Sequence, residues 1–584
     1  MIPGTSYVHS MGPRQTKFGR KLVKNELGNQ PAKPRHDHEG ANTSGPKLIF
    51  SCSLTELSGK CLDITPYASP RRFRMLSCPS LEHEDRLDVF EFERLPAGEY
   101  CAVSYVWRGV PVPDYTDSGT FTVRGAEDGD PINIDVLRDI VWVAGEEVKE
   151  YLWLDRIGII QSDKNDKAWQ IMQMFSIYKE STCIIVPGGV GRLAFSNDDT
   201  TWMDRAWTLQ EALAPERDQV IVLYSHSPFL EFEKHIASLS FIDTREKPLR
   251  PGRTSVPAAY MTLDDVLTVA KYSLKRPFGF NQAHAQPLIG ARISGAGQRQ
   301  AVWQCALMRT SSRPVDMIFS IMHFFGILLN PKEFEDDDRL GATVRFAQGI
   351  LADSQKGMLD DSDHWLCALY FMETSHQIST FPQFPETAVD GRAFIRMPNS
   401  ARRAVTDVMV EKYTKYTRAP LYPHFLAEKK DIGEMDDSGY YTFTAKYILP
   451  LRFVTSHPPV VNYPWDFDPE EAGWDPSGPI LAADGTEWRP MLTATSIPES
   501  RTQLPEADGW GIYLGDHLLL DIFMLVKNHG EGRFHGVTYF SFSRSMKLSD
   551  EDHTMQTWFP FVCHKIQISV GGPERVIRRP QKHV

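Results

Sequence analysis

Three short segments of the chain are apolar at almost every position, which is the pattern of strands covered on both faces. They are YCAVSYVW (100–107), YLWLD (151–155) and TCIIVPGG (182–189). Two segments between them, LRDIVWVAG (137–145) and KNDKAWQIMQMFSIYKE (164–180), carry apolar residues at helical intervals. Because strands and helices alternate, this region predicts a parallel sheet wrapped by helices.

The two helical segments also indicate boundaries and faces. In the first, Gly145 stands where the helix is expected to end. In the second, the buried face is predicted from Ala168, Met172, Phe175 and Tyr178. Short strands are expected earlier, from KLIFSC (47–52) to about Leu95, leading into the same domain.

A further helix is expected over TTWMDRAWTLQEALAP (200–215), and the strand QVIVLYS follows it. Thr201 and Asp204 are spaced as a capping box, and Pro215 marks the end of the helix. Trp207 and Glu211 are four residues apart, so they should share one helical face.

The pattern changes twice beyond this domain. Helical spacing recurs in LDDVLTVAKYSL, QRQAVWQCALM, PVDMIFSIMHFFGILL and ATVRFAQGILADS, whereas aromatic and β-branched runs dominate after about residue 400. The polar, locally basic start of the chain predicts disorder, with a targeting signal as the alternative. We therefore divide the chain into a tail (1–46), an α/β domain with N-terminal strands (47–240), a mainly helical region (250–400) and a β-rich region (401–584).

The composition is that of a folded protein, with 42% hydrophobic and 24% charged residues in 584. The net charge of −12 argues against a nucleic-acid-binding surface over the whole protein, although a local basic patch stays open. The eight scattered cysteines are expected to be reduced, buried thiols of an intracellular protein. No secretory signal is recognised, and the longest apolar stretch (317–329) is too short to span a bilayer. A cytoplasmic protein without a membrane span is expected.

Candidate chemistry gathers where the predicted strands end. Ligands of parallel sheets bind beyond the carboxyl ends of the strands. These ends are Trp107–Arg108, Asp155–Arg156 and Gly188–Gly189, which should share one rim. Glu211 by itself is most simply a solvated or ion-paired helical carboxylate. Its expected position near Trp207 and the rim makes Glu211 a candidate functional residue.

Other motifs are less informative. PGGVGRL (187–193) lacks the lysine and the spacing of phosphate-binding loops, so a plain turn is favoured over a phosphate site. HDH (36–38) lies in the tail, and Cys563–His564 has no second pair at zinc-like spacing, so no metal is expected. No nucleophile-elbow serine motif is present.

Three stretches together resemble the fungal heterokaryon-incompatibility (HET) domain: YCAVSYVWRG, YLWLDRIGIIQSDKNDKAWQIMQMFSIYKESTCIIVPGG and DRAWTLQEALAP. Their order and spacing also match, over roughly residues 96–225, and the later regions resemble the C-terminal extension of basidiomycete members. The family usually reads LSYVWG, whereas Arg108 precedes Gly109 here. It usually has cysteine and asparagine where this chain has Gly158 and Ile160. These departures fall on the predicted rim.

The resemblance implies a trigger of programmed cell death in fungal self/non-self recognition. HET domains are regarded as distant relatives of Toll/interleukin-1 receptor (TIR) domains, which implies a TIR-like, flavodoxin-like sheet flanked by helices. In catalytic TIR domains, a helical glutamate one turn after a tryptophan supports cleavage of NAD at the nicotinamide–ribose bond. WTLQE, from Trp207 to Glu211, is similar to that segment.

On this resemblance, Glu211 is the expected catalytic carboxylate, because a carboxylate stabilises the oxocarbenium-like ribose formed when the bond breaks. The residues expected to line the NAD site are Ser104, Tyr105, Trp107, Arg108, Asp155, Arg156 and Trp207. NAD would be a substrate, and no tightly bound cofactor is expected.

Two other functions stay open. A non-enzymatic module would self-associate or bind a protein partner in incompatibility signalling, as adaptor TIR domains do, and Glu211 would then make a structural hydrogen bond or ion pair. Alternatively, the α/β region is a remnant and the β-rich region binds the partner. Glu211→Gln separates the first two functions, because it would abolish NAD loss in one case and alter stability or oligomer size in the other.

Overall fold

The computed structural model describes most of the chain from residue 45 to residue 355 and separate segments after it. The described residues are 45–112, 118–227, 244–246, 257–272, 276–295, 297–355, 386–387, 393–396, 402–404, 422–423, 426, 432–456, 479–482, 485–491, 506–517, 520–543 and 563–571. Residues 1–44 of the predicted tail, with its HDH motif, lie outside them. Within these residues, no helix is long and apolar enough to cross a membrane.

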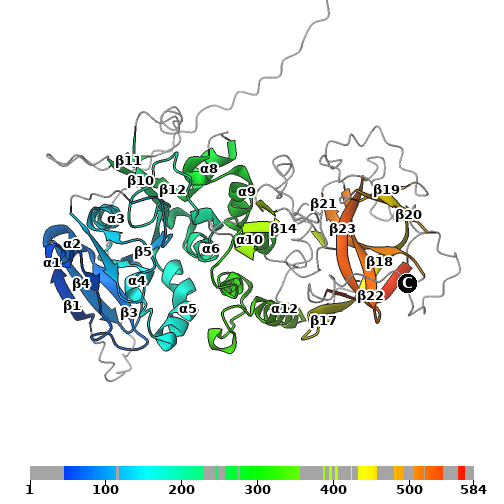
Figure 1. Ribbon diagram of the computed structural model, residues 1–584, viewed down its shortest axis with the longest axis horizontal. Coiled ribbons are helices and arrows are strands. Elements are labelled where there is room, and N and C mark those ends of the chain that lie inside the picture. Colours follow the sequence, from blue (N-terminus) through cyan, green and yellow to red (C-terminus); the bar gives the residue numbers. More distant parts are fainter. Residues whose placement is uncertain are drawn as a thin grey trace, which may run out of the picture. The chain divides into compact units, whose positions relative to one another are not determined.

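In the described part, a nine-stranded sheet organises the N-terminal region (Figure 1). Its strands, in spatial order, are β1 (Lys47–Ser53), β4 (Arg86–Phe92), β3 (Phe73–Ser77), β8 (Tyr151–Trp153), β5 (Tyr100–Tyr105), β9 (Thr182–Val186), β10 (Val220–Ser225), β12 (Ala258–Thr262) and β11 (Arg245–Glu246). The central strands β8, β5, β9 and β10 run parallel. Numbered along the chain, they have the 2-1-3-4 order of flavodoxin-like sheets. The predicted α/β fold class is confirmed.

Helices cover both faces of this sheet (Figure 1). α1 (Leu54–Leu57), α2 (Cys78–His83) and α3 (Ile134–Glu146) share a core with Cys101 and Val103 of β5. On the other face, α5 (Lys164–Lys179) and α6 (Ala206–Leu213) share a core with Tyr100 and Ala102. Because successive residues of β5 enter separate cores, the strand is apolar at nearly every position.

The end of α3 corrects one prediction. Gly145 lies inside the helix, and the chain turns instead at Val148, whose φ is 56°. The amide of Val148 donates to the Gly145 carbonyl at 3.0 Å, and that of Lys149 donates to the Ala144 carbonyl at 2.9 Å. These bonds form a Schellman motif in which a valine occupies the position that glycine usually takes.

The buried face of α5 was predicted only in part. Ala168 and Tyr178 are buried, but Met172 is 39% exposed, and Ile171 and Met174 fill the core instead. Phe175 is half-buried and stacks on the ring of His323, with centroids 5.0 Å apart. A distant segment of the chain therefore covers the second apolar stripe of the helix.

The capping box predicted before α6 is wrong. A short 3-10 helix, η1 (Trp202–Asp204), precedes α6, and neither helix has a side-chain cap. The amide of Ala206, at the start of α6, donates instead to the Thr310 carbonyl at 2.9 Å. A strand-like bridge from the helical region thus replaces the local cap.

Several short elements were not predicted. A three-stranded sheet in the described part joins β2 (Cys61–Leu62), β6 (Thr120–Val123) and β7 (Ile132–Asn133). The four-residue helix α4 (Asp155–Gly158) follows β8, and the 3-10 helix η2 (Arg217–Gln219) precedes β10.

The region after β12 is helical, as predicted. Its elements are α8 (Leu263–Tyr272), η3 (Pro277–Gly279), α9 (Gln282–Ala291), α10 (Gln298–Leu307), α11 (Asp316–Phe319), η4 (Met322–Phe325), η5 (Pro331–Glu333) and α12 (Arg339–Gln355). The apolar segment 314–329 is not one helix, because α11 ends after one turn and Gly326 ends η4 with φ at 72°.

The C-terminal region is β-rich, as predicted, although its first described strands begin at residue 386, inside the range 250–400 that was predicted to be mainly helical. Its strands are β13 (Glu386–Thr387), β14 (Ala393–Arg396), β15 (Arg402–Ala404), β16 (Tyr422–Pro423), β17 (Glu434–Met435), β18 (Tyr440–Ser456), β19 (Ile480–Leu481), β20 (Thr486–Pro490), β21 (Gly509–His517), β22 (Leu520–Gly530), β23 (Arg533–Ser543) and β24 (Cys563–Gly571). Among the described strands, each strand pairs with the next in the spatial order β21, β22, β23, β24, β18. The last of these, β18, also pairs with the first, β21. These strands form a closed ring.

The cysteines whose side chains are described accord with reduced thiols. Cys52, Cys61, Cys78, Cys101, Cys183 and Cys305 are free. Cys61 is exposed and Cys52 is half-buried, although both were expected to be buried. Cys367 and the side chains of the Cys563–His564 pair lie outside the described residues.

Candidate functional site

The ends of the parallel strands β5 and β8 meet at Asp155, the first residue of α4. Its carboxylate accepts hydrogen bonds from the Tyr105 hydroxyl, from Trp107 Nε1 at 2.6 Å and from the Arg156 amide at 2.7 Å. Burial raises the pKa of Tyr105 well above its ordinary value, and the neighbouring Asp155 adds to the shift. The structure therefore brings these predicted residues together at one rim.

Glu211 lies on the other side of β5, beneath Ser104. Ser104 Oγ donates to Glu211 Oε2 at 2.5 Å and accepts from Trp202 Nε1 at 2.8 Å. Ser104 and Trp202 are fully buried, and Glu211 is 7% exposed. Because successive strand residues point to opposite faces, Ser104 reaches Glu211 while Tyr105 reaches Asp155.

The environment of Glu211 favours its neutral form. The pKa of Glu211 is raised to about 8, mainly by burial and also by the charge of Asp155. The Ser104 hydrogen bond and the charges of Arg309 and Arg205 act in the opposite direction without offsetting the burial. At neutral pH, this carboxyl is mostly protonated and can donate as well as accept hydrogen bonds.

The remaining predicted site residues do not converge on Glu211. Trp207 is half-buried and donates a side-chain hydrogen bond to Asp316. Arg108 is exposed, with Nε 2.7 Å from the Asp128 carbonyl oxygen. Arg156 is 1% exposed, and its Nη1 donates to the Asp130 carbonyl at 2.6 Å. Thus, of the predicted side chains, only Ser104 is hydrogen-bonded to Glu211.

Two residues around Glu211 were missed from the sequence. Trp202 anchors Ser104, and the Arg309 guanidinium lies over the Trp202 ring, 5.9 Å from its centroid. Trp202 is adjacent to the DRAW motif but matches no chemical motif. Arg309 belongs to a region that the resemblance does not interpret, so no sequence signal identified it.

The glycine-rich turn after β9 packs against the turn after β5. A Cβ atom on Gly109 would lie 1.8 Å from the Gly188 carbonyl oxygen, and this oxygen accepts from the Val110 amide at 3.0 Å. The backbone of the turn is used in this packing, which supports the interpretation as a plain turn. Within the described residues, no cluster of three His, Cys, Asp or Glu side chains could hold a metal ion.

Gly158, a departure from the family pattern, has no room for a side chain. A Cβ atom there would lie 2.5 Å from Trp153 Nε1, whereas one on Gly145 would meet Glu82 Oε2 at an ordinary 3.6 Å. We expect Gly158→Ala to reduce the free energy of unfolding by about 1–3 kcal/mol through overpacking. Gly145→Ala, also helical, should be neutral or stabilising by up to about 1 kcal/mol. Urea denaturation of both variants measures the difference; equal effects would contradict the steric explanation.

Comparison with known families identifies one segment. Residues 100–194 match the family model described as Heterokaryon incompatibility protein (HET). No curated protein and no solved structure matches the chain significantly. The matched segment runs from β5 past β9 and includes Ser104 and Asp155, whereas Glu211 lies beyond it. Residues 100–194 therefore resemble a HET domain, as predicted; the basidiomycete type and the likeness to TIR domains stay predictions.

Proposed function

We propose that this HET-domain protein triggers regulated cell death in the cytoplasm during fungal self/non-self recognition, and that Glu211 catalyses cleavage of NAD at the nicotinamide–ribose bond. The match over residues 100–194 supports the first part. The second part rests on the Glu211 carboxyl, whose pKa burial raises to about 8 beside the parallel strands. A carboxyl with a strongly shifted pKa near such strand ends is a typical functional candidate.

Cleavage of NAD fits a carboxyl that becomes ionised when a positive charge lies beside it. The nicotinamide ring of NAD carries a positive charge, and the ribose becomes positive as the bond breaks. Each of these charges favours the ionised form of a nearby carboxyl and is stabilised by it. Ser104 would hold the carboxyl of Glu211 in one orientation through the hydrogen bond at 2.5 Å. NAD is a substrate in this proposal, with no tightly bound cofactor.

The test is NAD consumption and nicotinamide release by the purified full chain, at high protein concentration with a crowding agent. Glu211→Gln should reduce turnover by about 10²–10³-fold, the usual effect of removing one transition-state stabiliser. Wild-type turnover should rise with pH up to about 8, because the ionised carboxylate is the active form. Glu216→Gln, at an exposed position after α6, is the control. Unchanged turnover in E211Q would refute the catalytic role.

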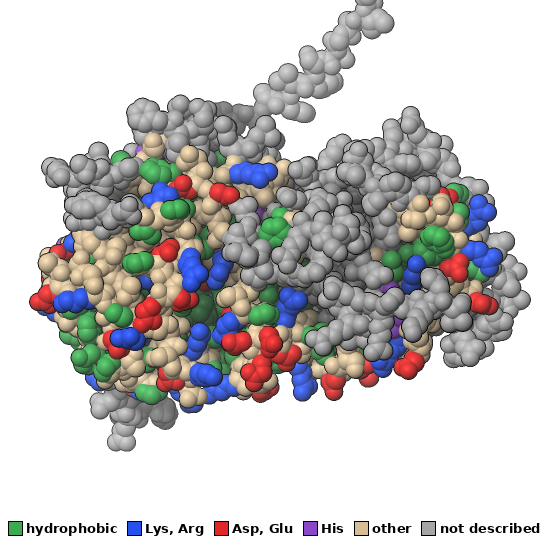
Figure 2. Space-filling view, in the orientation of Figure 1, with side chains coloured by type: hydrophobic (Ala, Val, Ile, Leu, Met, Phe, Trp, Pro, Cys, Tyr) green, Lys and Arg blue, Asp and Glu red, His purple; other side chains and the backbone are tan. Residues whose placement is uncertain are grey.

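One observation favours a non-enzymatic function. Glu211 is only 7% exposed and hydrogen-bonded to an internal serine, as a structural carboxyl would be. In that case, the HET domain would self-associate or bind a protein partner. Light scattering of the same samples would then show a change in oligomer size in E211Q, without NAD loss in any sample. Nucleic acid remains an unfavoured partner because the net charge is −12. Figure 2 shows one face of the molecule, on which described acidic and basic side chains intermingle.

A further inference from the structure

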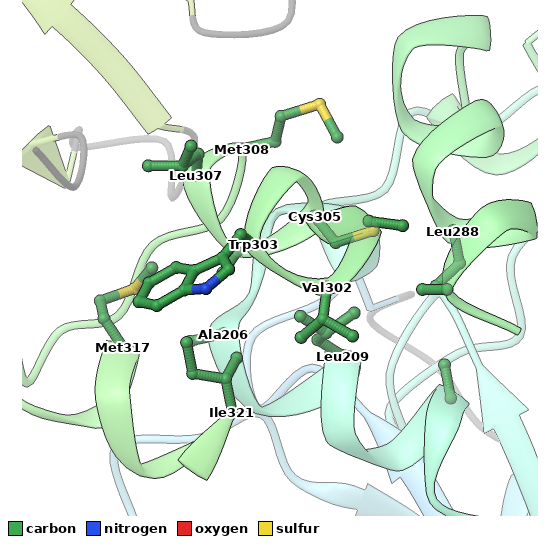
Figure 3. Packing of buried hydrophobic residues seen from close by; sticks show 14 of the residues in the cluster. Ala206, Leu209, Leu288, Val302, Trp303, Cys305, Leu307, Met308, Met317 and Ile321 are labelled. Atoms are coloured by element: carbon green, nitrogen blue, oxygen red, sulfur yellow. The ribbon is translucent and has the colours of Figure 1, made fainter. Parts of the chain in front are cut away.

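The helical region holds α6 at both of its ends. At the N-terminal end, Thr310 accepts from the Ala206 amide at 2.9 Å and donates its own amide to the Asp204 carbonyl at 2.7 Å. At the C-terminal end, Arg292 Nη1 donates to the Ala212 carbonyl at 2.5 Å. Between them, Leu209 of α6 packs near Val302 of α10 (Figure 3). The helix that carries Glu211 is therefore positioned from outside the matched family segment.

Arg309 makes the contact that leads from this region to Glu211. Its side chain is 2% exposed, and Nη1 donates to the Arg205 carbonyl at 2.8 Å and to Thr208 Oγ1 at 2.7 Å. The same guanidinium lies over the ring of Trp202. Since Trp202 donates to Ser104, and Ser104 donates to Glu211, one continuous series of contacts joins the arginine to the carboxyl.

We propose that Arg309 is a positioning residue for Glu211, acting through Trp202 and Ser104 and through its own positive charge. The effect of Arg309 on catalysis rests on the proposed NAD cleavage, whereas its effect on the ionisation of Glu211 does not. A partner that displaced the end of α10 would thereby change the charge state of Glu211. The helical region would act as a control element for the candidate site.

Two physical effects act in the same direction. Burial lowers the pKa of Arg309 to about 10, so the guanidinium remains positive at neutral pH. Its charge favours ionised Glu211, and its packing on Trp202 orients the donor that polarises Ser104. Removing Arg309 therefore weakens both supports of the carboxylate, and Glu211 should hold its proton to higher pH.

The experiment measures the ionisation of Glu211 without NAD. Urea denaturation of each variant, with and without Glu211→Gln, is followed from pH 4.5 to pH 10, and the paired difference gives the midpoint for Glu211. Arg309→Met should raise this midpoint by about one pH unit, or about tenfold in proton affinity. Arg309→Lys, which keeps the charge, should shift it less. Arg299→Met, in α10, is the control, because Arg299 Nε donates to the Phe324 carbonyl within the helical region.

An unchanged midpoint in Arg309→Met, or a shift equal to that of Arg299→Met, would overturn the proposal. If Arg309→Met does not fold, Trp202→Phe replaces it, because phenylalanine keeps a ring but lacks the donor to Ser104. No upward shift in that variant would equally overturn the proposal. A shifted Glu211 midpoint in protein that cleaves no NAD would support the coupling and refute catalysis. NAD turnover with an unshifted midpoint would support catalysis and refute the coupling.

Discussion

The free energy of unfolding of the wild-type protein is expected to fall between about pH 5 and pH 8, and Glu211→Gln is expected to abolish this fall. Burial raises the pKa of Glu211 from its ordinary 4.5 to about 8 in the folded protein. The folded state therefore binds a proton that the unfolded chain releases. The resulting stabilisation is complete below pH 4.5 and is lost as the pH rises through 8. The pKa difference corresponds to about 5 kcal/mol of unfolding free energy, and glutamine, which does not ionise, has no such loss.

Urea denaturation of wild type and E211Q at several pH values measures this effect. Near pH 5 the two proteins should have similar stability, because glutamine resembles the protonated carboxyl. Above pH 8, the wild type should be the less stable protein. Glu216→Gln, at an exposed site, should run parallel to the wild type. A constant difference between wild type and E211Q over this range would show that Glu211 does not titrate as described.

Arg74→Met should destabilise the protein by about 3–5 kcal/mol, because it leaves buried carboxylates without their cation. Arg74 is fully buried on β3, and its guanidinium bonds both oxygens of Asp166 at 3.0 Å. It also donates to Glu91 at 3.3 Å and to the Gly158 carbonyl at 3.0 Å. The cluster thus ties the antiparallel strands β3 and β4 to the end of α4 and the start of α5.

The matched control for this variant lies two residues earlier. Arg72 pairs with Glu93 at 2.9 Å, but both side chains are exposed. Arg72→Met should therefore cost less than about 1 kcal/mol, as surface ion pairs usually do. Denaturation midpoints of the two variants in urea compare them directly. Similar losses for both would indicate that solvent reaches the Arg74 cluster in the folded protein.

The parallel sheet could be predicted because its strands are buried on both faces, which leaves an apolar residue at nearly every position of β5 and β9. The face of α5 could not be predicted to the same degree. One apolar stripe of the helix is covered by the sheet, whereas in the other Phe175 packs on the ring of His323 and Met172 stays exposed. The sequence of α5 therefore has apolar residues on two sides, and their spacing alone does not show which side faces the sheet.

The sequence named candidate site residues, but it did not predict which of them contact one another. Ser104 and Glu211 are 107 positions apart, and only the packing of α6 on β5 brings them together. Strand alternation sends Tyr105 away from Glu211, although both residues stood in the same expected site. The start of α6 was misjudged because its partner, Thr310, lies in another region.

The closed ring of C-terminal strands limits how copies of this protein could polymerise. Among the described strands, every member of the ring has a hydrogen-bonded neighbour on each side, whereas β1 has a single neighbour, β4. Unpaired strand edges are the usual templates for intermolecular β-augmentation. Among the described strands, β-augmentation by a second copy would therefore use an open edge outside the ring, such as β1 of the N-terminal sheet or β19 of the C-terminal sheet, while the ring would contribute through its side chains.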